Sequence, residues 1–188
     1  RLLNFENNVI YQDDNYFNFS LDSVLLSNFV DVNKFKNKEI NILDMCTGNA
    51  PVCMLLSFRT NSSIVGVEIQ KEIYDLGCMS VKENNMDKQI RLINDDIKNI
   101  GNYYKKEYFD IITCNPPYFK VDKESNLNKN DIKSIARHEL KIKLEDIFSI
   151  ACKYLKNKGI FYLVHRPERL SEIFYLMKKY KLEPKRVR

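Results

Sequence analysis

The sequence predicts an α/β fold, a doubly wound and mostly parallel sheet covered by helices. From residue 40 onward, short apolar runs alternate with segments of helical periodicity. The apolar runs are unbroken, which is typical of strands buried on both faces. Strands that alternate with helices of this length indicate a parallel sheet. The chain has 188 residues, 44% of them hydrophobic, which is enough for one domain with a real core.

Five apolar runs are expected to be strands, because each is short and each ends in a polar residue or a turn. They are residues 40–43, 64–67, 90–93, 108–114 and 160–164. Residues 183–188 are expected to begin a sixth strand. The sheet is therefore expected to have at least five strands, all running in one direction.

Helical patterns fill most of the segments between these strands. They cover residues 51–58, 71–84, 145–155 and 168–180, and residues 21–30 carry another before the first strand. Pro51 stands in the first turn of its helix, where a missing N–H costs nothing. Gly159 is expected to stop the helix over residues 145–155. Residues 121–144 are rich in Lys, Asn and Asp and are expected to form a long loop.

Charge is distributed unevenly along the chain. Residues 1–119 hold 12 Lys/Arg and 16 Asp/Glu, whereas residues 120–188 hold 18 Lys/Arg and 9 Asp/Glu. The second part is therefore strongly basic, and a basic surface favours a polyanionic partner. An AT-rich genome would also enrich lysine, but it would do so in both parts of the chain.

The composition also excludes several classes of protein. No run of 18 apolar residues is present to span a membrane, and the first 20 residues lack the apolar core of a signal peptide. Five cysteines without a CxxC pair, and only two histidines, make a metal site unexpected. Unpaired thiols are typical of the reducing cytoplasm, where we expect this protein.

Polar residues gather at the carboxyl ends of the predicted strands. Those at or just past the ends of the first four strands are Asp44, Glu68, Asp96 and Asn115. In an open parallel sheet, ligands bind in the crevice beyond these ends. A single acid at a strand end is common, but four polar residues in succession predict a ligand site.

The loop after the first strand, residues 44–50, reads DMCTGNA. Gly48 permits a tight turn, and the N-terminus of the following helix favours negative ligand groups. The loop is neither a full GxGxxG nor a P-loop, so an ordinary strand-to-helix turn is the alternative. Glu68 lies 24 residues beyond Asp44. At that offset an acid accepts hydrogen bonds from ribose hydroxyls.

The most specific pattern is Asn115-Pro116-Pro117-Tyr118. The prolines remove backbone N–H donors and stiffen the chain. The side-chain carbonyl of Asn115 and the carbonyl of Pro116 would then act as paired acceptors for an amino group on a planar ring. Tyr118 offers a face on which that ring can stack. The alternative is a rigid turn, but this one falls where the ligand site is expected, so these four residues are the candidate catalytic residues.

Together these motifs resemble the class I S-adenosylmethionine-dependent methyltransferases, in which NPPY marks the branch that methylates exocyclic or amide nitrogen. Five segments narrow the resemblance to the bacterial tRNA1(Val) adenine-37 N6-methyltransferase family. They are FNFSLDSVLLSNF (17–29), CNPPYFK (114–120), IARHE (135–139), LVHRPERL (163–170) and LEPKRVR (182–188). The resemblance implies a Rossmann-like methyltransferase sheet, S-adenosylmethionine as the cofactor, tRNA as the substrate and direct methyl transfer without a strong general base.

The resemblance also implies which residues bind the cofactor. The residues expected against its methionine part are Asp44, Thr47, Gly48 and Asn49. Glu68 would bind the ribose, and Asp96 would hold the adenine amino group, with Asp95 as the less favoured substitute. Asn115 would border both cofactor and substrate. The residues expected to close the pocket from the N-terminal side are Phe19, Ser20 and Asp22.

The same resemblance divides the chain into an N-terminal extension, residues 1–39, and a methyltransferase domain, residues 40–188. The family's sheet has seven strands, so the domain is expected to be incomplete at its C-terminus. Ala50 stands where the family has glycine, which puts the geometry of the loop in question. The residues expected to contact RNA are Lys120, Arg137, His138, Arg166, Lys185 and Arg186, and a structural role is the alternative for each.

Other functions stay open at this stage. A protein glutamine N5-methyltransferase acting on release factors would also carry NPPY, but that family has a helical domain where only about 39 residues precede the first strand here. A DNA adenine methyltransferase would need an added target-recognition domain. A non-catalytic RNA-binding module with the same fold would not need an intact NPPY motif. A monomer is the expected oligomeric state.

Overall fold

The structure is a computed structural model of the chain, and it describes residues 8–13, 16, 19–35, 39–117 and 142–188. Tyr118, Lys120, Arg137 and His138 lie outside the described residues, as does most of the loop expected over residues 121–144. The chain divides into two compact units. The first comprises residues 1–115 and 154–164, and the second comprises residues 116–153 and 165–188.

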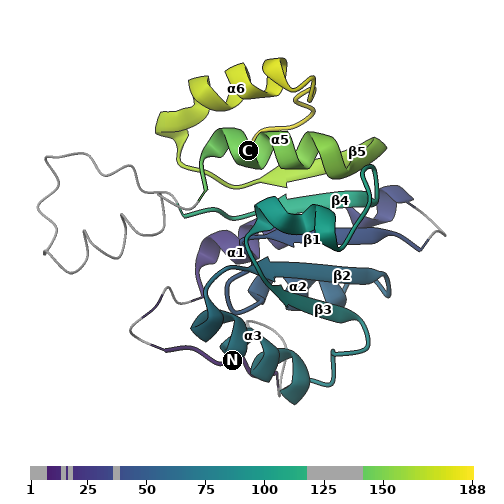
Figure 1. Cartoon of the computed structure of the whole chain (residues 1–188), viewed down its shortest axis with the longest axis vertical. Coiled ribbons are helices and arrows are strands. Elements are labelled where there is room, and N and C mark those ends of the chain that lie inside the picture. Colours follow the sequence, from purple (N-terminus) through teal and green to yellow (C-terminus); the bar gives the residue numbers. More distant parts are fainter. Residues whose placement is uncertain (1–7, 14–15, 17–18, 36–38, 118–141) are drawn as a thin grey trace, which may run out of the picture. The chain divides into compact units, whose positions relative to one another are not determined.

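The first unit is built on a parallel sheet (Figure 1). Its strands are β1 (Asn41–Met45), β2 (Ser63–Glu68), β3 (Ile90–Asn94), β4 (Phe109–Cys114) and β5 (Leu155–Leu163). Their order is β3-β2-β1-β4-β5, and every neighbouring pair is parallel. The predicted doubly wound α/β fold is confirmed. The strand order reverses between β1 and β4, which is the place where such sheets bind ligands.

The α-helices of the described residues also follow the predicted pattern. They are α1 (Leu21–Phe29), α2 (Pro51–Ser57), α3 (Lys71–Glu83), α5 (Leu144–Tyr154) and α6 (Leu170–Lys179). Short 3-10 helices add η1 (Val32–Phe35), η2 (Ile97–Asn102) and η3 (Pro167–Arg169). The helix expected over residues 168–180 therefore begins as a 3-10 turn and becomes α-helical at Leu170.

Two details of the predicted secondary structure are wrong. Gly159 does not stop a helix, because α5 ends at Tyr154 and β5 begins at the next residue. Phe109 pairs with Leu155 and Ile111 pairs with Ile160, so β5 takes up extra residues in a bulge that includes Gly159. Residues 183–188 form no strand among the described residues and are exposed to solvent.

The core of the first unit explains why α2 carries almost no polar residue. The buried faces of α2, β1 and β2 share one cluster of apolar side chains, and α1 packs against α2. Arg59, just after α2, donates hydrogen bonds to the carbonyls of Ser27 and Val30 at the end of α1. These bonds satisfy carbonyls that a helix end leaves without an intrahelical partner. The N-terminal helix is thereby fixed to the body of the first unit.

Because Gly66 in β2 has no side chain, it leaves space for the loop after β1. It pairs with Asp44 of β1 and with Leu92 of β3. A Cβ atom at this position would lie 2.8 Å from both Thr47 Oγ1 and Leu92 Cδ2. Such distances are too short for carbon contacts, so a side chain here would displace Thr47 or Leu92.

We expect Gly66→Ala to lower the free energy of unfolding by about 1–3 kcal/mol, the usual cost of overpacking a well-filled core. Urea denaturation followed by circular dichroism measures it. Ser63→Ala, at the exposed start of the same strand, is the control and should change stability by about 0.5 kcal/mol or less. Equal stability of the two variants would show that Thr47 does not depend on the space at Gly66.

Candidate functional site

The carboxylate of Asp44 stands at the centre of the site in the first unit. It is 1% exposed. Its Oδ2 accepts a hydrogen bond from the Thr47 hydroxyl at 2.6 Å, and its Oδ1 accepts one from the Thr113 hydroxyl at 2.7 Å. The Cys53 thiol lies 3.8 Å from Oδ2. Asp44 therefore joins the end of β1 to its own loop, to β4 and to α2, and its contact with a cofactor stays a prediction.

Burial decides the ionisation of Asp44. It raises the pKa of the carboxyl from 3.8 to about 6, and the nearby Glu68 charge adds to the rise. Hydrogen bonds from Thr47, Thr113 and Cys53 stabilise the ionised form and oppose the shift. Asp44 thus changes its charge in a mildly acidic range rather than in the usual range of a carboxyl group.

The loop between β1 and α2 turns through three residues with left-handed backbone. They are Cys46 (φ 58°), Gly48 (φ 60°) and Ala50 (φ 70°). Left-handed backbone costs a residue with a Cβ atom roughly 1–2 kcal/mol, and glycine avoids this cost. Ala50 therefore holds the conformation of the glycine expected at its position, as the N-cap residue of α2. The departure from the family pattern costs energy but leaves the turn intact.

Glu68 closes the loop from the end of β2. Its Oε2 accepts a hydrogen bond from the Gly48 N–H at 3.0 Å, and its Oε1 accepts one from the Gln70 N–H at 2.9 Å. Burial raises the pKa of Glu68, and these two backbone donors oppose the rise. The Gln70 side chain and the Ile69 N–H also stabilise the ionised carboxylate, and its contact with a ligand's hydroxyls stays a prediction. The space where a Cβ of Gly48 would stand is open.

Asp95 and Asp96, after β3, have different surroundings. Asp95 accepts hydrogen bonds from the Asn99 side chain at 2.8 Å and from the Tyr103 hydroxyl at 2.9 Å. These bonds lower the pKa of Asp95 and occupy one acceptor position on each of its oxygens. Asp96 caps η2, with its Oδ1 accepting the Lys98 N–H at 3.0 Å. Which of these two acids meets a ligand stays a prediction.

Asn115, after β4, is oriented by the N-terminal helix. Its Nδ2 donates a hydrogen bond to the hydroxyl oxygen of Ser23 at 3.3 Å. Ser23 is a buried residue of α1 and was missed by the sequence reasoning, which selected Phe19, Ser20 and Asp22. Ser20 is the N-cap of α1, and Phe19 packs against the core of the first unit. The only signal for Ser23 was a small polar residue inside an apolar helical pattern.

A second N-terminal segment also reaches the loop. The Tyr11 carbonyl accepts a hydrogen bond from Asn49 Nδ2 at 2.7 Å, and the Tyr11 N–H donates to the Ser80 hydroxyl of α3. Val9 exchanges two hydrogen bonds with the side chain of Asn84. Residues 9–11 therefore run along α3 and are tied to Asn49, a contact that sequence reasoning did not predict.

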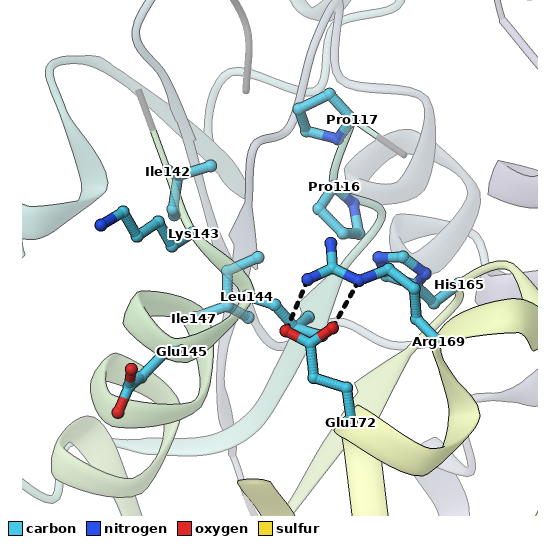
Figure 2. A pocket seen from close by; sticks show the side chains of 10 residues that line it. All are labelled: Pro116, Pro117, Ile142, Lys143, Leu144, Glu145, Ile147, His165, Arg169 and Glu172. Atoms are coloured by element: carbon cyan, nitrogen blue, oxygen red, sulfur yellow. Dashed lines mark hydrogen bonds and ion pairs between the residues drawn. The ribbon is translucent and has the colours of Figure 1, made fainter. Parts of the chain in front are cut away.

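The second unit carries a pocket of its own, drawn in Figure 2, with a volume of about 260 Å³. Pro116 and Pro117 form part of its wall, together with residues of α5 and with His165, Arg169 and Glu172. The predicted RNA contacts Arg166, Lys185 and Arg186 are exposed in this unit. Lys185 forms an ion pair with Glu183. Whether these cations contact RNA stays a prediction.

Comparison with known proteins decides the family. A model of the methyltransferase domain matches residues 36–185. The chain belongs to this methyltransferase-domain family. Its curated relatives include tRNA1(Val) (adenine(37)-N6)-methyltransferases of Phocaeicola vulgatus and of a Flavobacteriaceae bacterium, which are 25% and 27% identical over 160 and 161 residues. Each alignment covers 85% of this chain and 64% of the relative, so the chain spans less than two thirds of their length.

Solved structures confirm the methyltransferase fold. A predicted O-methyltransferase of Agrobacterium tumefaciens superposes with a TM-score of 0.62 at 18% identity, covering 84% of this chain and 67% of that one. Geranyl diphosphate C-methyltransferase of Streptomyces coelicolor, solved with S-adenosyl-L-homocysteine, gives 0.55 at 15% identity, covering 84% and 51%. These neighbours share the Rossmann-like methyltransferase fold with the chain.

Neither a membrane-spanning helix nor a metal-binding cluster is present among the described residues. None of the helices in this part of the chain is long and apolar enough to cross a membrane. No group of three or more His, Cys, Asp or Glu side chains in this part is arranged to hold a metal ion.

Asp44 makes stability depend on pH between about 4 and 6. Its folded pKa, about 6, lies above its unfolded value of 3.8, so the folded state holds the proton more tightly. Stability is therefore lost as the pH rises through this window, and the total loss, from well below pH 4 to well above pH 6, is about 3 kcal/mol at 1.36 kcal/mol per pH unit. We expect the unfolding free energy of the wild type, minus that of Asp44→Asn, to fall by about 2 kcal/mol from pH 4 to pH 6.

Urea denaturation at a series of pH values measures this difference, and Asp95→Asn is the control for its sign. The pKa of Asp95 is lowered in the folded state, so its contribution is lost as the pH falls instead. A wild-type minus Asp44→Asn difference that stays flat, or rises with pH, would contradict the assignment of the buried proton to Asp44.

Proposed function

We propose that this chain is the methyltransferase part of an enzyme that methylates the exocyclic N6 of adenine in tRNA, at position 37 of the tRNA(Val) anticodon loop. The observation that carries the proposal is the placement of Asn115. It follows β4 at the point where the strand order reverses, and its amide nitrogen is committed to Ser23. The amide oxygen is thus the atom of this side chain that is suited to accept from a substrate amino group.

The residues at the ends of β1, β2 and β3 fit S-adenosylmethionine. Open space lies beside the left-handed Gly48, and the carboxylate of Glu68 stands at the same turn. Glu68 would accept from the ribose hydroxyls, and Asp96 would accept from the adenine amino group. Asp44, Thr47 and Asn49 would shape the wall next to the methionine part. A related fold, the geranyl diphosphate C-methyltransferase, was solved with S-adenosyl-L-homocysteine.

The N-terminal residues would complete this pocket. Ser23 of α1 contacts Asn115, and Tyr11 contacts Asn49, so two N-terminal segments touch residues of the proposed site. Both contacts support the assignment of residues 1–39 as the part that closes the cofactor pocket. Phe19, Ser20 and Asp22 would contribute to the same wall.

The reaction needs positioning more than acid–base chemistry. The cofactor supplies an activated methyl group on a sulfonium. Asn115 Oδ1 and the Pro116 carbonyl would accept the two amino hydrogens and favour a pyramidal nitrogen with an available lone pair. The methyl group would pass from the sulfonium sulfur to N6, and N6 would lose one proton to water. Holding donor and acceptor in this geometry can supply much of the acceleration.

The tRNA assignment draws on two further observations. Curated relatives of the chain carry the name tRNA1(Val) (adenine(37)-N6)-methyltransferase. The basic character of residues 120–188 suits a polyanion, because neutralisation of phosphates dominates such binding. An anticodon-loop base is single-stranded and can be splayed into a pocket without breaking a duplex. Such an enzyme would act in the cytoplasm, and we expect it to act as a monomer.

Cofactor binding is tested by comparing the two neighbouring acids. Asparagine can still cap η2, so Asp96→Asn removes the charge without removing the cap. We expect this variant to bind S-adenosylhomocysteine about tenfold more weakly by calorimetry, which is the loss of one hydrogen bond to a charged group. Asp95→Asn is the matched control and should stay within about threefold of the wild type. The reverse order would move the adenine contact to Asp95.

Methyl transfer is tested with labelled S-adenosylmethionine and total tRNA from cells that lack the activity. Nucleoside mass spectrometry should find new N6-methyladenosine with the wild-type protein. Asn115→Ala should lower transfer by about 10²-fold or more, the usual cost of one group that acts at the reacting atoms. Its affinity for S-adenosylhomocysteine should fall by a much smaller factor than transfer does, and Asn102→Ala, an exposed asparagine of η2, should remain active.

Three results would count against the proposal. Label found on a release factor and not on tRNA would indicate the glutamine methyltransferase. Binding of both cofactor and tRNA without any transfer would indicate a non-catalytic module. An Asn115→Ala protein with normal transfer would refute the role given to the amide.

A further inference from the structure

The backbone of residues 9–11, the N-terminal strap, is bound by side chains at the C-terminal end of α3. Val9 exchanges two hydrogen bonds with the carboxamide of Asn84: its N–H donates to Oδ1 at 3.0 Å, and its carbonyl accepts from Nδ2 at 2.7 Å. The Tyr11 N–H donates to the Ser80 hydroxyl at 2.9 Å. The strap therefore lies against α3 (Figure 1), although 75 and 69 residues separate the bonded pairs in the sequence.

The spacing of the two anchors explains why they fit the strap. Ser80 belongs to α3 and Asn84 is its C-cap residue. Residues four apart on a helix share a face and are about 6 Å apart along its axis. Val9 and Tyr11 are two residues apart, and extended backbone covers about 6.6 Å over that length. The strap runs antiparallel to α3, so it leads from Asn84 toward the end of the helix that follows β2.

The same strap fixes one end of Asn49 in the loop between β1 and α2. Asn49 is 5% exposed, and its Nδ2 donates to the Tyr11 carbonyl at 2.7 Å. A backbone carbonyl only accepts hydrogen bonds, so it must meet the nitrogen of the carboxamide and not the oxygen. The strap therefore decides which way the carboxamide is turned, and its acceptor oxygen is the end opposite to that contact.

Helix α3 also confines the backbone of Asn49. A Cβ atom at Gly77 would lie 3.4 Å from the Cα and from the carbonyl carbon of Asn49, and 3.0 Å from Leu92 Cδ1. Helix and loop come together this closely because position 77 has no side chain. Asn49 is thus held by its backbone against α3 and by its amide nitrogen on Tyr11, next to the open space at Gly48.

The chemistry of the cofactor's methionine part fits this arrangement. That part carries an ammonium group, which only donates hydrogen bonds, and a carboxylate, which only accepts them. With its nitrogen on Tyr11, Asn49 has its oxygen suited to the ammonium group. A carboxamide turned by 180° would oppose its oxygen to the Tyr11 carbonyl and its nitrogen to the ammonium, so both contacts would be lost.

We propose that the N-terminal strap, anchored by Ser80 and Asn84, positions Asn49 to accept a hydrogen bond from the ammonium group of S-adenosylmethionine. Ser80 and Asn84 are then positioning residues, which act on the ligand only through the strap and Asn49. This inference rests on the proposed function for its choice of cofactor. The coupling is reciprocal: if the bound strap raises the affinity for the cofactor, the cofactor stabilises the bound strap by the same factor.

Two ligands separate this role from a general effect on the pocket. S-adenosylhomocysteine keeps the ammonium group, whereas methylthioadenosine keeps the adenosine and the sulfur but has no amino-acid part. Calorimetry on the whole chain measures both affinities for the wild type, Asn49→Ala, Asn84→Ala and their double variant. Ser80→Ala is a second way to release the strap. Lys82→Ala, which removes an exposed side chain near the same end of α3, is the control, and circular dichroism checks that each variant is folded.

We expect Asn49→Ala to bind S-adenosylhomocysteine about tenfold more weakly, which is the loss of one hydrogen bond to a charged group. Asn84→Ala and Ser80→Ala should each weaken it by about fivefold, the lower end of typical coupling between sites. These three variants should bind methylthioadenosine as the wild type does, and Lys82→Ala should bind both ligands normally. In the Asn49→Ala background, Asn84→Ala should have no further effect, because the residue through which it acts is absent.

Hydrogen exchange tests the same coupling in the wild type, without any substitution. S-adenosylhomocysteine should slow the exchange of the Val9 and Tyr11 amides by about fivefold, because binding favours the bound strap. Methylthioadenosine should slow it much less, since it lacks the group that Asn49 contacts.

Other results would overturn the inference. Equal weakening of both ligands by Asn84→Ala would make the strap a general support of the fold. Additive losses in the double variant would show that Asn84 does not act through Asn49. Exchange of Val9 and Tyr11 that ignores S-adenosylhomocysteine would exclude the coupling, whether or not the variants fold. A wild type that binds neither ligand would remove the proposed function together with this inference, whereas normal binding with additive losses would remove the inference alone.

Discussion

The buried carboxylate of Asp44 is the constraint on which the rest of the first unit's site depends. A carboxylate at 1% exposure is costly unless its oxygens are hydrogen-bonded, and here Thr47, Thr113 and Cys53 surround it. Each partner comes from a different place in the chain: the loop, β4 and α2. One charge therefore fixes three elements at the point where the strand order reverses. The raised pKa of Asp44 shows that these bonds offset only part of the cost of burial.

The geometry of the loop follows from that constraint. With Thr47 held by Asp44, the backbone must turn sharply at Cys46, Gly48 and Ala50, and all three adopt left-handed conformations. The turn directs the Gly48 N–H to Glu68 and so connects the ends of β1 and β2. The absence of a side chain at Gly66 is part of the same arrangement, because a Cβ there would collide with Thr47. Strain in the loop is thus offset by contacts that the loop itself makes possible.

Periodicity was enough to predict the sheet and most helices, because burial on both faces leaves its mark on local sequence. The strands β1 to β4 differ from the predicted ranges by only a few residues at either end. The start of β5 could not be found this way, since the bulge that admits Lys158 and Gly159 depends on pairing with β4. Local composition at Gly159 suggested a helix stop, but its conformation is set by a strand far away in sequence.

The strand-end acids of the site were also predictable, while their partners were not. Asp44, Glu68 and Asp96 stand at positions that the strand pattern defines. Thr113 and Ser23 contact the site across 69 and 92 residues, and neither has a local signature. Ala50 shows the opposite case, because its residue type argued against a tight turn that the surrounding hydrogen bonds nevertheless impose. The partners of the strand-end residues and the turn at Ala50 are set by polar contacts between residues far apart in the sequence, which local sequence patterns do not predict.

Ser23 connects the N-terminal helix to Asn115 of the NPPY motif, which lies 92 residues away in the sequence. The two ends of a carboxamide have nearly the same shape but opposite hydrogen-bonding character. With its oxygen toward a substrate amino group, Asn115 would be an acceptor, and turned by 180° it would present a second donor. In the structure the Ser23 hydroxyl accepts from Nδ2, which is the first orientation. Arg59 in turn holds the end of the helix that carries Ser23. The position of the Asn115 side chain therefore depends on a helix that packs on α2, and a change in that packing would move a contact of the motif without changing the motif's sequence.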